Sequence, residues 1–140
     1  DGSRIGANDP AALAEVGIGS APALMATWVT DRAGLERYAG DALAVTDDRP
    51  RIEYGPWVLP GDFPRTLVHL FGVRGEPPLT KADAAFQSQV ATARDALLSF
   101  YQAGLSAYQG DREGWGRIMQ YVFEIEPNNP YYRWALGSGR

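Results

Sequence analysis

The sequence predicts a mainly α fold with short N-terminal helices, a proline-rich and partly extended middle, and a C-terminal helical hairpin. Two observations lead to this prediction. Apolar residues recur at spacings of three and four between residues 80 and 125, which is the periodicity of amphipathic helices. Prolines at positions 50, 56, 60, 64, 77 and 78 interrupt the middle of the chain, and proline breaks the interior of a helix.

Three short helices are predicted between residues 8 and 41. The first begins at Pro10, after a capping Asn or Asp, because the missing N–H of proline has no partner in the first turn of a helix anyway. Ser20 begins the second helix in the same way, and Asp31 caps a third helix that Gly40 ends. Residues 1–7 are expected to be disordered or to derive from cloning.

The middle of the chain is predicted to be irregular. Residues 51–54 form a candidate strand, whereas residues 66–73 form either a second strand or a short buried helix, because periodicity does not distinguish the two in so short an apolar run. Residues 55–79 are interpreted as a proline-rich connector. A stretch of this length without regular structure is uncommon in a compact domain unless it is functional or contacts a partner.

The last third, residues 80–140, predicts a helical hairpin followed by the start of a further helix. Thr80 is the expected N-cap of a long helix, whose apolar stripe extends from Phe86 to Tyr108. Arg94 is expected on the solvated side of this helix. A short connection at residues 110–111 ends it and begins a second helix, which makes the two helices antiparallel neighbours.

The connection and the end of the second helix resemble a tetratricopeptide repeat. The resemblance rests on Gly110-Asp111, on Trp115 and on the phrase Ile125-Glu126-Pro127-Asn128-Asn129. The chain departs from the repeat at Trp115 and Ala103, where the repeat has Ala and Gly. The resemblance implies a tetratricopeptide-like hairpin, and one alternative function is therefore that of a peptide-binding helical module.

A second resemblance lies in the run Val45-Thr46-Asp47-Asp48-Arg49-Pro50-Arg51-Ile52-Glu53-Tyr54. This run resembles a signature of bacterial spermidine synthase-like proteins, including large ones in which a membrane-spanning half precedes the synthase half. Residues 8–54 are then a C-terminal segment of such a protein. The resemblance implies a parent aminopropyltransferase of polyamine biosynthesis in the bacterial inner membrane, with this part in the cytoplasm and the rest of the polypeptide as its partner.

The chemistry of that parent enzyme is not expected in this chain. Its fold binds decarboxylated S-adenosylmethionine on a glycine-rich loop between a strand and a helix, and no such loop follows a strand here. We therefore assign no catalytic residue and no cofactor to the chain. His69 lies between apolar residues and is interpreted as a half-buried, hydrogen-bonded histidine.

Two groups of residues are nevertheless candidates for binding. Three carboxylates form a candidate polyamine site, for which a turn stabilised by hydrogen bonds and ion pairs is the simpler structural interpretation: Asp47, Asp48 and Glu53. Three aromatic side chains are candidate partner contacts, with core packing as the alternative: Trp57, Tyr131 and Trp134.

Composition narrows the function further. With 140 residues, 45% of them hydrophobic, the chain is long enough for one core and one predicted domain. A net charge of −4 argues against a nucleic-acid partner. The lack of cysteine and the single histidine argue against a metal site, and no apolar run reaches the roughly 20 residues that cross a bilayer. We expect a soluble, non-catalytic structural or interaction domain, which associates with itself or with a protein partner.

Overall fold

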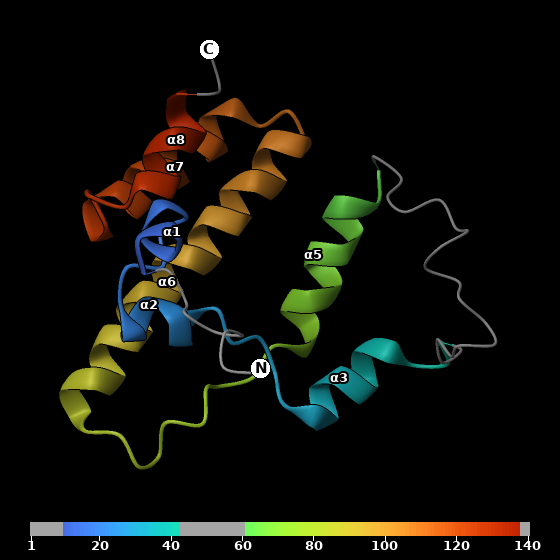
Figure 1. Cartoon of the computed structure of the whole chain (residues 1–140). Coiled ribbons are helices and arrows are strands. Elements are labelled where there is room, and N and C mark those ends of the chain that lie inside the picture. The colour runs from blue at the N-terminus through green and yellow to red at the C-terminus, as the bar shows by residue number, and fades with distance from the viewer. Residues whose placement is uncertain (1–9, 43–60, 138–140) are drawn as a thin grey trace, which may run out of the picture. The chain divides into compact units, whose positions relative to one another are not determined.

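The computed structural model describes residues 10–42 and 61–137, and these residues are mainly helical, as the sequence predicts (Figure 1). The chain divides into two compact units. Unit 1 consists of residues 1–28 and 78–140, and unit 2 consists of residues 29–77. Unit 1 is therefore formed by two separate stretches of the sequence.

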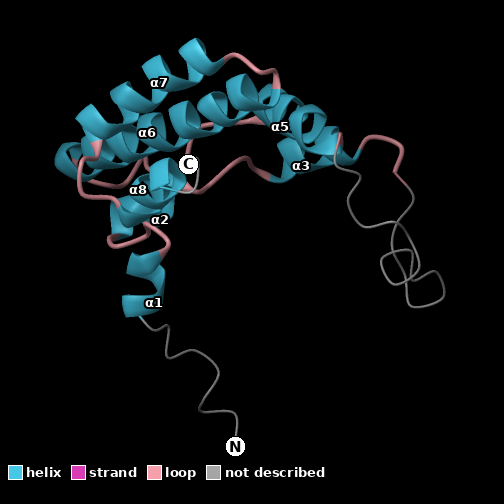
Figure 2. Cartoon of the chain, turned by 90° about the horizontal axis from the view of Figure 1, so that it is seen from above, coloured by secondary structure: helices cyan, strands magenta, loops and turns pink. Residues whose placement is uncertain are grey.

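Unit 1 is built around the predicted hairpin. Its long helix α6 (Ala84–Tyr108) is followed after a short connection by α7 (Arg112–Ile125), which packs along it (Figure 2). Helix α8 (Pro130–Gly137) follows α7, and the N-terminal stretch adds α1 (Pro10–Glu15) and α2 (Ala21–Ala26). Helix α2 packs against α6, and α1 contacts α8. The first and the last helix of the described residues thus contact each other within unit 1.

The core of unit 1 lies between α6, α7 and α8. Ala96, Val122 and Tyr132 are buried together, and Phe100 packs against them with its ring centroid 5.1 Å from that of Tyr132. Alanines at fully buried positions of α6 leave room for the neighbouring helices to approach closely. The predicted apolar stripe is wrong at its end, because Tyr108 is 59% exposed in the last turn of α6.

Local sequence signals explain where most of these helices begin. The side chains of Ser20 and Asp111 accept hydrogen bonds from backbone N–H groups of the first turns of α2 and α7. The prediction for α6 is wrong by three residues: Asp83, and not Thr80, is its N-cap, and its carboxylate accepts from the N–H of Phe86 at 2.7 Å. Thr80 instead lies in a turn whose carbonyls accept hydrogen bonds from Gln87 further along.

Arg94 also differs from its prediction. It is only 7% exposed, and its guanidinium donates a hydrogen bond to the backbone carbonyl of Trp28, just after α2. This contact joins residues 66 positions apart in the sequence, so helical periodicity alone does not reveal it. The long side chain is buried because the docking of α2 on α6 covers it.

Unit 2 contains α3 (Arg32–Ala39) and α5 (Asp62–Val73), which pack against each other. The second of these decides between the two alternatives for residues 66–73, which form part of a helix and not a strand, and twelve residues of the segment interpreted as a connector, 55–79, lie in this helix. Pro64 does not prevent this helix, since it lies in the first turn, where backbone N–H groups have no partner within the helix. His69 is exposed and stacks on Tyr38 at 4.6 Å.

Candidate functional site

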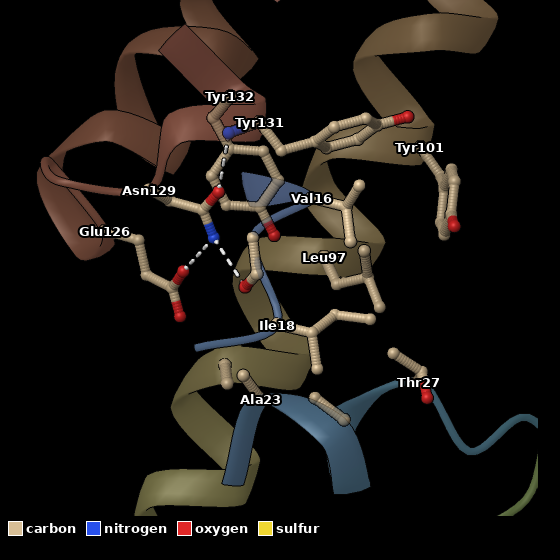
Figure 3. A pocket seen from close by; sticks show the side chains of 13 residues that line it. Val16, Ile18, Ala23, Thr27, Leu97, Tyr101, Glu126, Asn129, Tyr131 and Tyr132 are labelled. Atoms are coloured by element: carbon tan, nitrogen blue, oxygen red, sulfur yellow. Dashed lines mark hydrogen bonds between the residues drawn. The ribbon is translucent and has the colours of Figure 1, made fainter. Parts of the chain in front are cut away.

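The candidate site is a pocket of about 240 Å³ within unit 1 (Figure 3). Four parts of the unit form it: the turn after α1, helix α2, the middle of α6, and the segment from the end of α7 into α8. Val16, Ile18 and Leu97 supply apolar surface. The polar side chains Glu126 and Asn129 lie at one end of the pocket, beside this apolar surface.

Asn129 and Gly17 join the two sequence stretches of unit 1 at this polar end. The Nδ2 of Asn129 donates to the carbonyl of Gly17 at 3.3 Å, across 112 residues of sequence. Gly17 has a positive φ of 84°, and a Cβ at this position would lie only 2.5 Å from Oδ1 of Asn129. Glycine is therefore required here both by the backbone conformation and by the close approach of the asparagine.

The same amide also positions Glu126 and the first turn of α8. The Nδ2 of Asn129 donates to Oε2 of Glu126 at 2.8 Å, and its Oδ1 accepts from the backbone N–H of Tyr131 at 3.1 Å. Both donors and the acceptor of the amide are thus used. The other carboxylate oxygen of Glu126, Oε1, accepts no hydrogen bond from the residues that the structure describes.

Three tyrosines border the pocket, and burial affects the ionisation of Tyr101 and Tyr132. Tyr132 is only 3% exposed, and burial is the main cause that raises the pKa of its hydroxyl well above the ordinary value, with the negative charge of Glu126 adding to the effect. Burial likewise raises the pKa of Tyr101, to which Tyr131 also contributes. These phenols consequently stay protonated at neutral pH, which makes them hydrogen-bonding groups and poor bases.

The hydroxyl of Tyr132 is the accessible end of an otherwise buried side chain. It forms no hydrogen bond with any residue in the described ranges. Within those ranges, no fully buried side-chain oxygen or nitrogen lacks a partner, so this hydroxyl is reached by solvent. Because Tyr132 lines the pocket, a molecule in the pocket reaches the hydroxyl as well.

A second recess adjoins the first at the polar end. It has a volume of about 450 Å³ and shares Gly17, Ala23, Glu126 and Asn129 with the first pocket. Its own wall includes Ser20 at the start of α2 and the prolines that flank the turn between α7 and α8. Glu126 and Asn129 thus face both recesses, which form one extended depression on unit 1.

Of the predicted site residues, the structure places Tyr131 in the lining of this pocket and Trp134 beside Tyr131. The ring of Tyr131 stacks on that of Trp134, with 6.2 Å between the centroids and 21° between the planes. Trp134 is 66% exposed. The remaining predicted site residues lie outside the described ranges, as does the candidate strand at residues 51–54: Asp47, Asp48, Glu53 and Trp57.

Sequence reasoning did not identify the residues that shape the pocket. Glu126 and Asn129 belong to the repeat-like phrase at residues 125–129, and no pattern in the sequence identifies Gly17 as a site residue. No pattern in the sequence indicates that Tyr101 and Tyr132 border a pocket. The signal that does exist is local: Asn129 before Pro130 marks a helix start, where the asparagine side chain accepts from the first turn.

Two further observations concern metal binding and membrane insertion. No group of three or more His, Asp or Glu side chains in residues 10–42 and 61–137 is placed to hold a metal ion. Helix α6 is 25 residues long, but neither it nor another helix of the described ranges has an apolar stretch that could cross a bilayer.

Comparison of the chain with protein-family models, with curated proteins and with solved structures finds no match. The resemblances to spermidine synthase-like proteins and to tetratricopeptide repeats therefore stay predictions.

Proposed function

We propose that the chain is a non-catalytic interaction domain, and that unit 1 docks a segment of a partner protein at the pocket. The observation that supports this most directly is the pair Tyr131 and Trp134. Tyr131 borders the pocket and stacks on Trp134, whose ring is largely exposed next to it. A recess beside an exposed tryptophan is typical of interface hot spots, where one anchoring side chain enters a pocket and aromatic residues exclude water around it.

The dimensions of the pocket favour a side chain as its occupant. Its volume of about 240 Å³ is below the range of about 300–1,000 Å³ that is usual for pockets holding a whole drug-sized ligand. The adjoining recess of about 450 Å³ extends the depression, so that residues next to the anchor have room. A short peptide segment matches this pair of connected recesses better than a single compact metabolite.

The polar groups of the pocket are suited to binding. Apart from Glu126, its titratable side chains are three phenols, and those of Tyr101 and Tyr132 have raised pKa values and remain protonated. Such groups orient a ligand through hydrogen bonds but do not accept its protons. The resemblance at residues 45–54 adds the proposal that the parent is a spermidine synthase-like protein, whose remaining polypeptide would then be a nearby partner.

Selection of peptides from a random display library against the purified chain tests the docking function. Trp134→Ala is expected to lower the affinity of the chain for the selected peptides by about tenfold, because an exposed hot-spot tryptophan contributes most of its area to the contact. Tyr108→Ala is the matched control, since Tyr108 is 59% exposed on α6 and does not line the pocket. Fluorescence polarisation with labelled peptides measures both affinities.

Two results would contradict the docking function. The first is a library that yields no peptide with saturable binding. The second is an equal loss of affinity in Trp134→Ala and Tyr108→Ala, because that would place the peptides elsewhere on the chain.

A further inference from the structure

The amide of Asn129 and the carboxylate of Glu126, at the polar end of the pocket, offer an acceptor and no free donor, whereas the tyrosine hydroxyls of the lining can donate or accept. Both N–H groups of the Asn129 amide are used, one by the carbonyl of Gly17 and one by Oε2 of Glu126. Oε1 of Glu126 remains open as an acceptor among the described residues. A ligand group that contacts Oε1 of Glu126 must therefore supply a donor of its own.

The only formal charge among the residues that line the pocket is negative. Glu126 is the one lining residue with a formal charge, and no Lys, Arg or His is among the residues that line either recess. An anionic group would enter without a counter-charge and next to a carboxylate, which is costly in a partly desolvated site. A cationic group meets both the charge and the acceptors.

Tyr132 provides a second polar group at the same place. Its side chain is buried in the core to 3% exposure, yet its hydroxyl has no partner among the described residues and opens onto the pocket. Solvent reaches this hydroxyl and no described residue binds it, so it is accessible to a polar group of a ligand in the pocket. The neutral phenol supplies a further acceptor to a donor in the pocket.

From these contacts, and building on the docking function proposed above, we infer that the pocket binds a lysine side chain of the partner segment. The ammonium group lies at the polar end, where Oε1 of Glu126 and the hydroxyl of Tyr132 accept its N–H groups. The aliphatic stem of the lysine packs on the apolar wall of Val16, Ile18 and Leu97.

The state of the Glu126 carboxylate favours lysine over arginine. Arginine binds a carboxylate best through two parallel hydrogen bonds, which need both oxygens. Here Oε2 is held by Asn129, so that one oxygen is left for the ligand. Each N–H group of an ammonium needs only one acceptor oxygen. The three N–H groups can rotate together, so they can bond acceptors that come from different elements of the structure.

Titration of the full ¹⁵N-labelled chain with n-butylamine hydrochloride, followed by NMR, tests the ligand chemistry. Sodium butyrate and 1-butanol at matched ionic strength are the anionic and neutral comparisons. We expect saturable shifts of the Gly17, Ile18 and Asn129 amide signals with n-butylammonium and no saturable shift with butyrate. Butyrate binding as tightly as n-butylammonium, or no saturable shift with the amine, overturns the inference.

Two variants assign the contacts. Glu126→Gln keeps an oxygen that accepts from Asn129, and it is expected to lower the affinity for n-butylammonium by about tenfold. Tyr132→Phe is expected to lower the same affinity by about threefold or more. Glu124→Gln is the matched control, because it makes the same change of charge on an exposed residue of α7 and should leave the affinity unchanged. An equal loss in Glu124→Gln and Glu126→Gln would mean a general charge effect and would overturn the assignment.

The peptides selected for the docking function then identify the source of the ammonium. Lysine-containing peptides that displace n-butylammonium, and that lose affinity when the lysine is replaced by methionine, support a partner lysine. Peptides that bind at Trp134 without a lysine leave the docking function intact and overturn this inference. Binding of n-butylammonium that no selected peptide displaces makes a free alkylamine the ligand and overturns the partner assignment.

Discussion

Tyr132 combines two roles in one side chain. Its ring closes the core with Ala96 and Val122, while its hydroxyl reaches the pocket without a hydrogen-bond partner among the described residues. Burial disfavours the phenolate in the folded chain, so the raised pKa of Tyr132 couples the ionisation of this residue to folding. The stability of unit 1 should therefore respond to alkaline pH.

The direction of this response follows from the shift. Below pH 10 the tyrosine is protonated in both the folded and the unfolded chain, and its contribution to stability is complete. As the pH rises above 10, the unfolded chain loses the proton while the folded chain retains it, so the free energy of unfolding falls. Tyr132→Phe removes this contribution, and its stability is expected to fall less steeply with pH.

Chemical denaturation of the wild type and Tyr132→Phe at pH 7 to 11 measures the effect. At pH 7 the two proteins should be nearly equally stable, because the lost hydroxyl has no partner among the described residues. A Tyr132→Phe variant with the same alkaline slope as the wild type would contradict a buried phenol at this position.

At the scale of single elements, the caps show how local signals set the ends of helices. Asp111 begins α7, and its Oδ1 accepts from the N–H of Gly114 at 2.9 Å. Gly114 is buried, and a Cβ there would overlap with Oδ2 of Asp111. The carboxylate thus occupies the space beside the glycine, and the two residues together fix the turn between α6 and α7.

Asp111→Ala is expected to lower the free energy of unfolding by about 1 kcal/mol, because the N–H of Gly114 loses its acceptor. Asp111→Asn should retain most of the stability, since asparagine caps helices about as well as aspartate. Urea denaturation followed by the circular dichroism of the helices compares the three proteins. Equal losses in both variants would mean that the charge, and not the cap, stabilises the hairpin.

The elements that sequence reasoning predicts well are those decided by neighbours in the chain. Ser20, Asp31 and Asp111 cap helices as expected, because each hydrogen bond joins residues three positions apart. Arg94 and Asn129 were not predicted, because their partners lie 66 and 112 residues away. The pocket also depends on such long-range contacts. Its walls come from separate stretches of the sequence, and the periodicity within each stretch does not indicate that they lie together.

At the scale of the whole molecule, unit 2 interrupts unit 1 in the sequence. The chain segments that enter and leave unit 2 are hydrogen-bonded to each other: the N–H of Gly75 donates to the carbonyl of Val29 at 2.9 Å, and the hydroxyl of Thr30 donates to the carbonyl of Val73 at 2.7 Å. The two ends of the interrupting segment therefore lie side by side. Insertions with adjacent ends are tolerated well, because they do not stretch the host.

Replacing residues 30–74 by a linker of about three residues should accordingly leave unit 1 folded, since consecutive Cα atoms span about 3.8 Å each. Circular dichroism should show the helical signal of α6 and α7 with a cooperative thermal transition. The peptides selected with the full chain should bind the shortened one with the same affinity. A shortened chain that does not fold would show that unit 1 depends on residues 30–74.

The hydrogen bond between Gly17 and Asn129 has a consequence for the order of folding. The hairpin of α6 and α7 joins residues close in sequence, and such local contacts form quickly. The N-terminal turn, in contrast, is synthesised first but finds its partner only after the turn beyond α7 has been made. Closing so long a loop costs chain entropy before the contact returns any stability. We therefore expect the pocket to be the last part of unit 1 to assemble, so that a chain able to bind is also a chain that has finished folding.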